Sequence, residues 1–172
     1  MRARLMLPLV LSFAVAAAPL ARAAAPAPAT PNPAPLGTFS SWTAATYDSG
    51  GQKICYAFTR PTSSTGVVPD RGEVLLSVTQ RPGVRDEAAL SAGFTYEKSA
   101  NVTLNVGGTV LSLYTAGNAA FARDGAAAVR AFKAGVTAVV HSPGPHGVKV
   151  SDSFNLDGFT DAYDAIVKAC PK

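Results

Sequence analysis

Short stretches of alternating apolar and polar residues run through most of this chain, with the two-residue period of strands that bury one face. EVLLSVTQR, NVTLNV, TVLSLYT and VTAVV show this pattern and are rich in β-branched and aliphatic residues, and GVKVSDSF repeats it after HSPGPHG. Gly107 and Gly108 separate NVTLNV from TVLSLYT, which is a strong signal for a tight hairpin. The pattern therefore predicts a chain that is mainly β.

Two further strands are predicted at Phe39 to Asp48 and Lys53 to Arg60, because the turn residues SGG lie between them. AGFTYEK predicts another strand, with Ala92, Phe94 and Tyr96 on one face. PTSSTGVVPDRG and RPGVRDEA carry the Pro, Gly and Asp residues that are typical of turns. Both are predicted to be loops.

A helical period occurs in two segments. Apolar residues from Phe159 to Cys170 recur at intervals of three and four and form one stripe, with Asp157 predicted as the N-cap and Pro171 as the stop. A second helix is predicted from Asp124 to Ala134, with Gly135 after its end.

These elements amount to about nine short strands and two short helices without a regular alternation of strand and helix. Such an order predicts an antiparallel β-sandwich or curled barrel, with the C-terminal helix packed on the sheet. Trp42, the single tryptophan, falls in an alternating strand and is predicted to anchor the core.

The first 23 residues have the parts of a secretory signal peptide. Two arginines precede an apolar run that is too short to cross a bilayer, and Ala21-Arg22-Ala23 has the form of a cleavage site. Cleavage is predicted before Ala24, and the alternative site at Ala23 to Ala25 would leave Pro26 directly after the cut. Residues 1–23 are thus predicted to be removed.

The residues after the signal divide by composition into a tether and a domain. Residues 24–35, AAPAPATPNPAP, have no periodic apolar face and predict an extended Ala/Pro-rich tether. Residues 36–172 are predicted to form a single β-rich domain.

Removal of the signal also changes the charge. The chain has 15 Lys and Arg against 11 Asp and Glu, and loss of Arg2, Arg4 and Arg22 leaves 12 basic residues and a formal net charge of +1. A nucleic-acid partner is not expected, because such sites need clustered positive charge. No transmembrane span is expected after cleavage, since no later apolar stretch reaches the ~18 residues that a span requires.

Cys55 and Cys170 are the two cysteines of the sequence. Export would place them in an oxidising compartment, where one disulfide between them is the simplest interpretation. The loop closed by this bond would span nearly the whole domain, and the chain-entropy argument gives it about 4 to 5 kcal/mol of stabilisation. The alternative is a reactive or metal-binding thiol, although Cys55 has no CxxC partner.

The histidines, His141 and His146, are separated by SPGP. A metal site would need further ligands, of which Asp152 is the nearest; the competing interpretation is an exposed hairpin tip with both imidazoles in water. The sequence has no G-x-S-x-G motif, and DSFNLDG lacks the ligand alternation of a calcium loop. We therefore expect no enzyme, no metal and no cofactor.

Several basic residues fall at predicted loops or strand ends and are interleaved with acidic ones. They are compatible with a weak interaction rim for an acidic polysaccharide, a lipid headgroup or a protein, or with an ordinary solvated surface of mixed charge. The rim would consist of Arg60, Arg71, Arg81, Arg85, His141 and His146.

Several stretches, taken in order, resemble the invasion-associated locus B family of exported bacterial proteins. They run from FSSWTAATYDSGGQKICYA through RGEVLLSVTQRP, AGFTYEKSANVTLNVGG and FKAGVTAVV to SDSFNLDGFTDAYDAIVKAC, and cover nearly all of Phe39 to Cys170. The resemblance implies export, one β-rich domain and a periplasmic or secreted, envelope-associated location. It implies no catalytic residues. The Ala/Pro leader and HSPGPHG depart from the family pattern.

The predicted function is a non-catalytic binding or interaction module whose partner is an envelope or surface protein or a glycan. A link to host-cell invasion follows from the family resemblance alone. A periplasmic β-barrel that binds a small ligand is the first alternative, and an envelope hydrolase is a more distant one.

Overall fold

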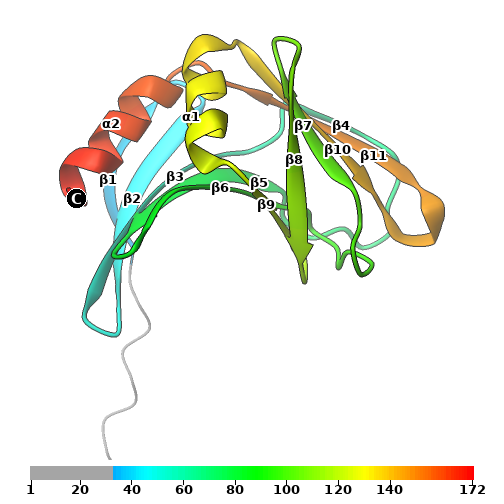
Figure 1. The fold of residues 1–172 in the computed structure, drawn as a ribbon, viewed down its shortest axis with the longest axis horizontal. Helices are drawn as coiled ribbons and strands as arrows, with labels where there is room; N and C mark the ends of the chain where they lie inside the picture. The colour runs from blue at the N-terminus through cyan, green and yellow to red at the C-terminus, as the bar shows by residue number, and fades with distance from the viewer. Residues whose placement is uncertain (1–32) are drawn as a thin grey trace, which may run out of the picture. The chain divides into compact units, whose positions relative to one another are not determined.

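A single antiparallel sheet is the main feature of the computed structural model, which describes residues 33–172. The predicted signal peptide and most of the predicted tether lie outside the described residues. Eleven strands pair in the order β1-β2-β3-β5-β6-β9-β8-β7-β10-β11-β4, and the two edge strands do not pair with each other. The sheet is therefore open, and two helices lie on the same side of it (Figure 1).

The elements follow the chain as β1 (Ala34–Phe39), β2 (Trp42–Ser49), β3 (Gln52–Thr59), β4 (Ser63–Thr65), β5 (Leu75–Arg81), β6 (Val84–Ser91), β7 (Val102–Val106), β8 (Thr109–Ala116), β9 (Ala119–Ala122), α1 (Gly125–Ala134), β10 (Thr137–Pro143), the 3-10 turn η1 (Pro145–Gly147), β11 (Lys149–Asn155) and α2 (Phe159–Ala169). The predicted class, mainly β with a C-terminal helix on the sheet, is confirmed. β1 begins two residues before the predicted domain boundary at Leu36.

Some local predictions were wrong. PTSSTGVVPDRG, predicted to be a loop, contains the short strand β4. RPGVRDEA forms a turn at Pro82 and Gly83 followed by β6, so its charged residues lie in a strand. AGFTYEK contains no strand residue, because Gly93 has a φ of 74° and lies so close to Gly72 that a Cβ would come 2.4 Å from the Gly72 carbonyl oxygen. Ala92, Phe94 and Tyr96, which were predicted to share one face, are nevertheless all buried.

The start of α2 also differs from the prediction. Gly158, with a φ of 85°, is the N-cap and no side chain caps the helix, whereas Asp157 was predicted to do so. A Cβ at Gly158 would lie 1.9 Å from the Phe39 carbonyl oxygen, so only glycine allows the chain to pass β1 at this point. The N-cap of α1 is Asp124, as predicted, and its Oδ1 accepts the Ala127 N–H at 2.8 Å.

An aromatic cluster fixes both helices on the sheet. α2 packs on β1, β2, β3 and β5, while α1 packs on β6. The ring centroids of Trp42 and Phe159 are 4.8 Å apart, and those of Phe132 and Phe159 are 5.2 Å apart. Trp42 is fully buried and its indole N–H donates to the Asn155 carbonyl at 3.1 Å, which confirms its predicted role. The cluster thereby sets where the end of α2 meets β3.

Candidate functional site

A disulfide joins the last helix to the sheet. Cys55 lies in the middle of β3 and Cys170 directly follows α2; their sulfurs are bonded at 2.12 Å and their Cα atoms are 6.0 Å apart. Both residues are buried, and the described residues contain no free cysteine. The predicted pairing is confirmed, and neither sulfur is available as a thiol or as a metal ligand.

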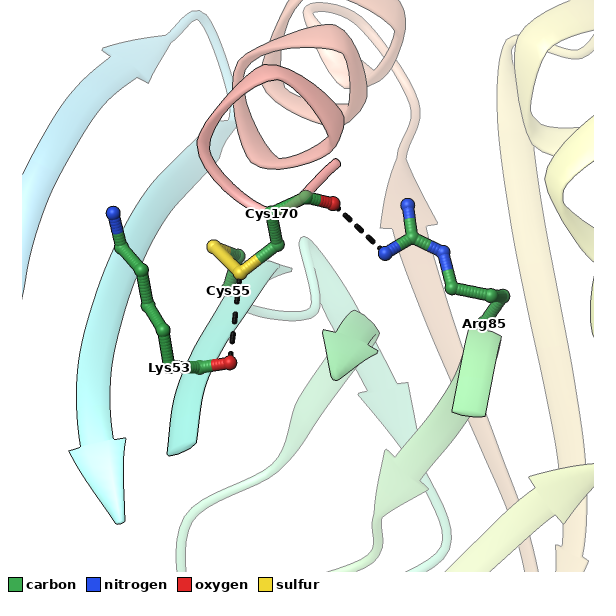
Figure 2. Close-up of a disulfide and its surroundings, with 4 residues drawn as sticks. All are labelled: Lys53, Cys55, Arg85 and Cys170. Carbon is green, nitrogen blue, oxygen red and sulfur yellow. Dashed lines mark hydrogen bonds between the residues drawn. A yellow bond between two sulfur atoms is a disulfide. The ribbon is translucent and has the colours of Figure 1, made fainter. Parts of the chain in front are cut away.

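Two further contacts surround the disulfide (Figure 2). Arg85 of β6 donates from Nη1 to the Cys170 carbonyl oxygen at 2.8 Å, and Cys170 Sγ lies 3.6 Å from the Lys53 carbonyl oxygen. The last carbonyl groups of a helix have no partner within the helix and carry partial negative charge. The guanidinium of Arg85 satisfies one of them and brings a positive charge to this end of α2.

Beside the disulfide is a cleft of about 420 Å³, which we call the disulfide cleft. The start of β3, the turn between β5 and β6, and the residues that end and follow α2 form its walls. Its lining contains four cationic side chains and no acidic one. The lining residues are Lys53, Arg81, Pro82, Gly83, Arg85, Ala169, Cys170, Pro171 and Lys172.

A hydrogen-bonded group behind the cleft holds α2 against the β5–β6 hairpin. The Tyr163 hydroxyl donates to Asp86 Oδ1 at 2.7 Å, and the buried Gln80 side chain donates to the same oxygen at 2.7 Å. Burial, and then the adjacent Asp86 carboxylate, raises the pKa of Tyr163 to about 12. Together with the disulfide, these bonds fix the walls of the cleft relative to one another.

The four arginines of the predicted rim do not form one surface. Arg81 pairs with Glu87 at 2.7 Å and lines the disulfide cleft with Arg85. Arg60 pairs with Glu73 on an exposed surface. Arg71 is largely buried at a different place, where it pairs with Asp152. Each of the four thus has a partner, and only two of them share a site.

Arg71 belongs to a buried ion pair at the other end of the sheet. Its guanidinium donates to both carboxylate oxygens of Asp152, at 2.9 and 2.7 Å, and its Nε donates to the Ala92 carbonyl at 2.8 Å. The side chain of Asp152 is fully buried and also accepts the Ser64 hydroxyl at 2.7 Å. The charges of Arg71 and Asp152 therefore neutralise each other, and the pair joins segments that are distant in the sequence.

The histidines lie in different settings. His141 is an exposed residue within β10, which corrects the predicted loop, and it lines a cleft of about 460 Å³ that also contains Lys149. His146 is exposed in η1 with a φ of 56°. Asp152, considered as a third ligand, is bound by Arg71. Within residues 33–172, no group of three or more His, Cys, Asp or Glu side chains is placed to hold a metal ion.

Sequence reasoning missed Lys53 and the cleft itself. The lining comes from residues 53, 81–85 and 169–172, and no spacing between such segments signals their meeting. The predicted disulfide was the one clue, because it brings Lys53 and Lys172 near each other through their neighbouring cysteines.

Among the described helices, none combines the length and apolar character needed to span a membrane.

Comparisons with known proteins agree with the fold. A family model described as "Invasion associated locus B (IalB) protein" matches residues 42–167. The crystal structure of invasion associated protein B from Bartonella henselae superposes with a TM-score of 0.53 at 18% identity, covering 79% of this chain and 98% of that one, which is a likeness of fold. Comparison with curated proteins gives no match. Because the family model covers well over half of its length, the chain belongs to the invasion associated locus B family.

Proposed function

We propose that this protein is exported to the cell envelope and acts there as a non-catalytic interaction module whose contact surface is the disulfide cleft. The observation that carries the proposal is the cleft, in which a disulfide and four cationic side chains meet without an acidic side chain. The predicted signal peptide and the disulfide, which forms and persists outside the cytosol, support an extracytoplasmic location.

The chemistry of the lining favours binding over catalysis. General acid–base or nucleophilic catalysis needs a group such as His, Glu, Ser or a free thiol, placed beside a second group that activates it. The cleft offers guanidinium and ammonium groups with ordinary apolar surface between them, and its sulfur is bonded in a disulfide. Such a surface attracts and positions an acidic group.

The cleft is also held in shape before any partner arrives. The disulfide joins the end of α2 to β3, and the bonds from Arg85 to the Cys170 carbonyl and from Tyr163 to Asp86 both join it to β6. A surface that is already ordered loses less conformational entropy on binding. The open order of the eleven described strands gives no support to the alternative of a ligand enclosed in a β-barrel.

The proposal is tested by photo-crosslinking in living cells. A photoreactive amino acid would replace Lys53 in the cleft or, as the control, Lys149, which is equally an exposed lysine but lies on β11. We expect mass spectrometry of the envelope fraction to show one recurrent partner from position 53 and not from position 149. The same products from both positions, or none from either, would contradict the proposal. A partner of host origin would extend it to the invasion that the family name mentions.

A further inference from the structure

We propose that the disulfide cleft binds a small molecule that joins one acidic group, a carboxylate or a phosphate, to an apolar body. This inference rests on the proposed function and names the ligand class of the same site. Two properties of the cleft carry it: cations without a carboxylate partner, and apolar surface beside them.

Most of the positive charge in the cleft is not neutralised by the protein. Arg81 pairs with Glu87, but within residues 33–172 no carboxylate lies within 4.0 Å of Lys53, Arg85 or Lys172. Like charges that share a concave surface repel one another and raise the local concentration of anions. An anion in the cleft would relieve this repulsion.

The C-terminal end of α2 is the one part of the cleft that disfavours the binding of an anion. The C-terminal end of a helix carries about half a negative charge, and α2 ends at the cleft. Arg85 offsets this charge, because it donates to the Cys170 carbonyl at the helix end. The positive charges of Lys53 and Lys172, which have no carboxylate partner, then remain, so the cationic character of the cleft outweighs the helix end.

The rest of the lining calls for an apolar body on the ligand. Pro82, Ala169, Pro171 and the disulfide of Cys170 contribute apolar surface between the cationic groups. The cleft, about 420 Å³, is within the range of roughly 300 to 1,000 Å³ that small-molecule sites occupy. A bare inorganic anion would meet the charges and leave this apolar surface in water, whereas an acyl or aryl group would cover it.

The ligand class is tested by isothermal titration calorimetry of the exported protein with its disulfide intact. Decanoate and decyl phosphate provide the two acidic groups on the same chain, below their micelle concentrations. Decanol lacks the charge, and inorganic phosphate lacks the apolar body. We expect binding of at least one amphiphilic anion, at least tenfold tighter than that of decanol and of phosphate, and the tighter of the two anions identifies the acidic group.

A charge reversal locates the binding. Lys53→Glu should weaken the binding of the preferred anion at least tenfold, while Lys168→Glu should weaken it less than threefold. Lys168 is an exposed lysine of α2, two residues before Cys170, but it does not line the cleft. The two variants therefore make the same change in net charge at nearby positions. Circular dichroism would verify that both are folded.

Several outcomes would overturn the ligand class. One is that neither decanoate nor decyl phosphate binds, and another is that decanol binds as tightly as they do. A third is that Lys53→Glu and Lys168→Glu weaken the binding of the anion to the same extent. The last result would show a general attraction to positive charge. If in-cell crosslinking from position 53 still yields a specific partner, the interaction function stands and the small amphiphilic ligand alone is rejected.

Discussion

The two ends of the sheet are fastened to distant parts of the chain by different means. At the β1–β2–β3 end, the disulfide bonds residues that are 115 positions apart and holds α2 in place. At the β10–β11–β4 end, the buried pair of Arg71 and Asp152 does the corresponding work without a covalent bond. The attachment at the first end is stable only where the disulfide stays oxidised, whereas the attachment at the second end is stable only while both charged side chains are present.

The noncovalent fastening joins three segments through one side chain. Arg71 donates to Asp152 on β11 and to the Ala92 carbonyl, and its guanidinium lies over the Phe94 ring at 5.3 Å from the centroid. Ser64 of the edge strand β4 donates to the same carboxylate. A strand of three residues gains little from its own ladder, so this contact helps to keep β4 at the edge.

Loss of the disulfide and loss of the ion pair have different consequences for the stability of the fold. A disulfide stabilises mainly by restricting the unfolded chain, and its loss leaves no unsatisfied group in the fold. A buried ion pair has already lost the hydration of both ions, so removal of one partner leaves the other charged, buried and alone. The ion pair should therefore be more sensitive to a single substitution than the disulfide.

The largest effect is expected from Arg71→Ala. This change leaves the fully buried Asp152 carboxylate without its guanidinium, and we expect a loss of about 3 to 5 kcal/mol in the free energy of unfolding. Urea denaturation followed by circular dichroism measures it. A loss below about 1 kcal/mol, as for an exposed pair, would contradict this account of the β11 end.

The control replaces both partners with apolar residues of similar size, as Arg71→Met together with Asp152→Leu. Because no buried charge remains, the double variant should lose less stability than Arg71→Ala. A double variant as unstable as the single one would show that the packing of the Arg71 stem, and not its charge, holds this end of the sheet.

The next largest effect is expected from the disulfide. Replacement of Cys55 and Cys170 together by serine should lower the free energy of unfolding by about 2 to 4 kcal/mol, and reduction of the native protein should do the same. Denaturation with and without dithiothreitol provides the measurement. Unchanged stability in both experiments would mean that the noncovalent contacts of α2 are sufficient.

The smallest effect is expected from the Tyr163 hydroxyl, which joins α2 to β6 near the disulfide and whose contribution to stability depends on pH. The pKa of Tyr163 is about 12 in the fold and about 10 in the unfolded chain, so the fold favours the protonated hydroxyl. The stabilisation is complete below about pH 10 and is lost as the pH rises toward about 12. The stability advantage over Tyr163→Phe should thus shrink between about pH 9 and about pH 11. An advantage that stays constant over this interval would show that the hydroxyl bond to Asp86 is not the cause.

Local patterns predicted most of the elements because they are written in consecutive residues. The Gly107-Gly108 hairpin, the cap at Asp124 and the apolar stripe of the last helix required no knowledge of the rest of the chain. The failures occurred where tertiary contacts prevail over local pattern. Asp86 is tolerated in β6 because Gln80 and Tyr163 donate to it, and Gly158 replaces Asp157 as the cap because Phe39 passes so close.

By itself, the sequence determined that this protein is mainly β, ends in a helix, pairs its two cysteines and buries its tryptophan. Period, turn chemistry and the small number of cysteines are enough for these conclusions. The tertiary structure alone decided which arginines share a site, that Arg71 and Asp152 are buried together, and that Lys53 meets the end of α2. Such contacts join residues far apart in the sequence, and their geometry depends on how the whole sheet places them.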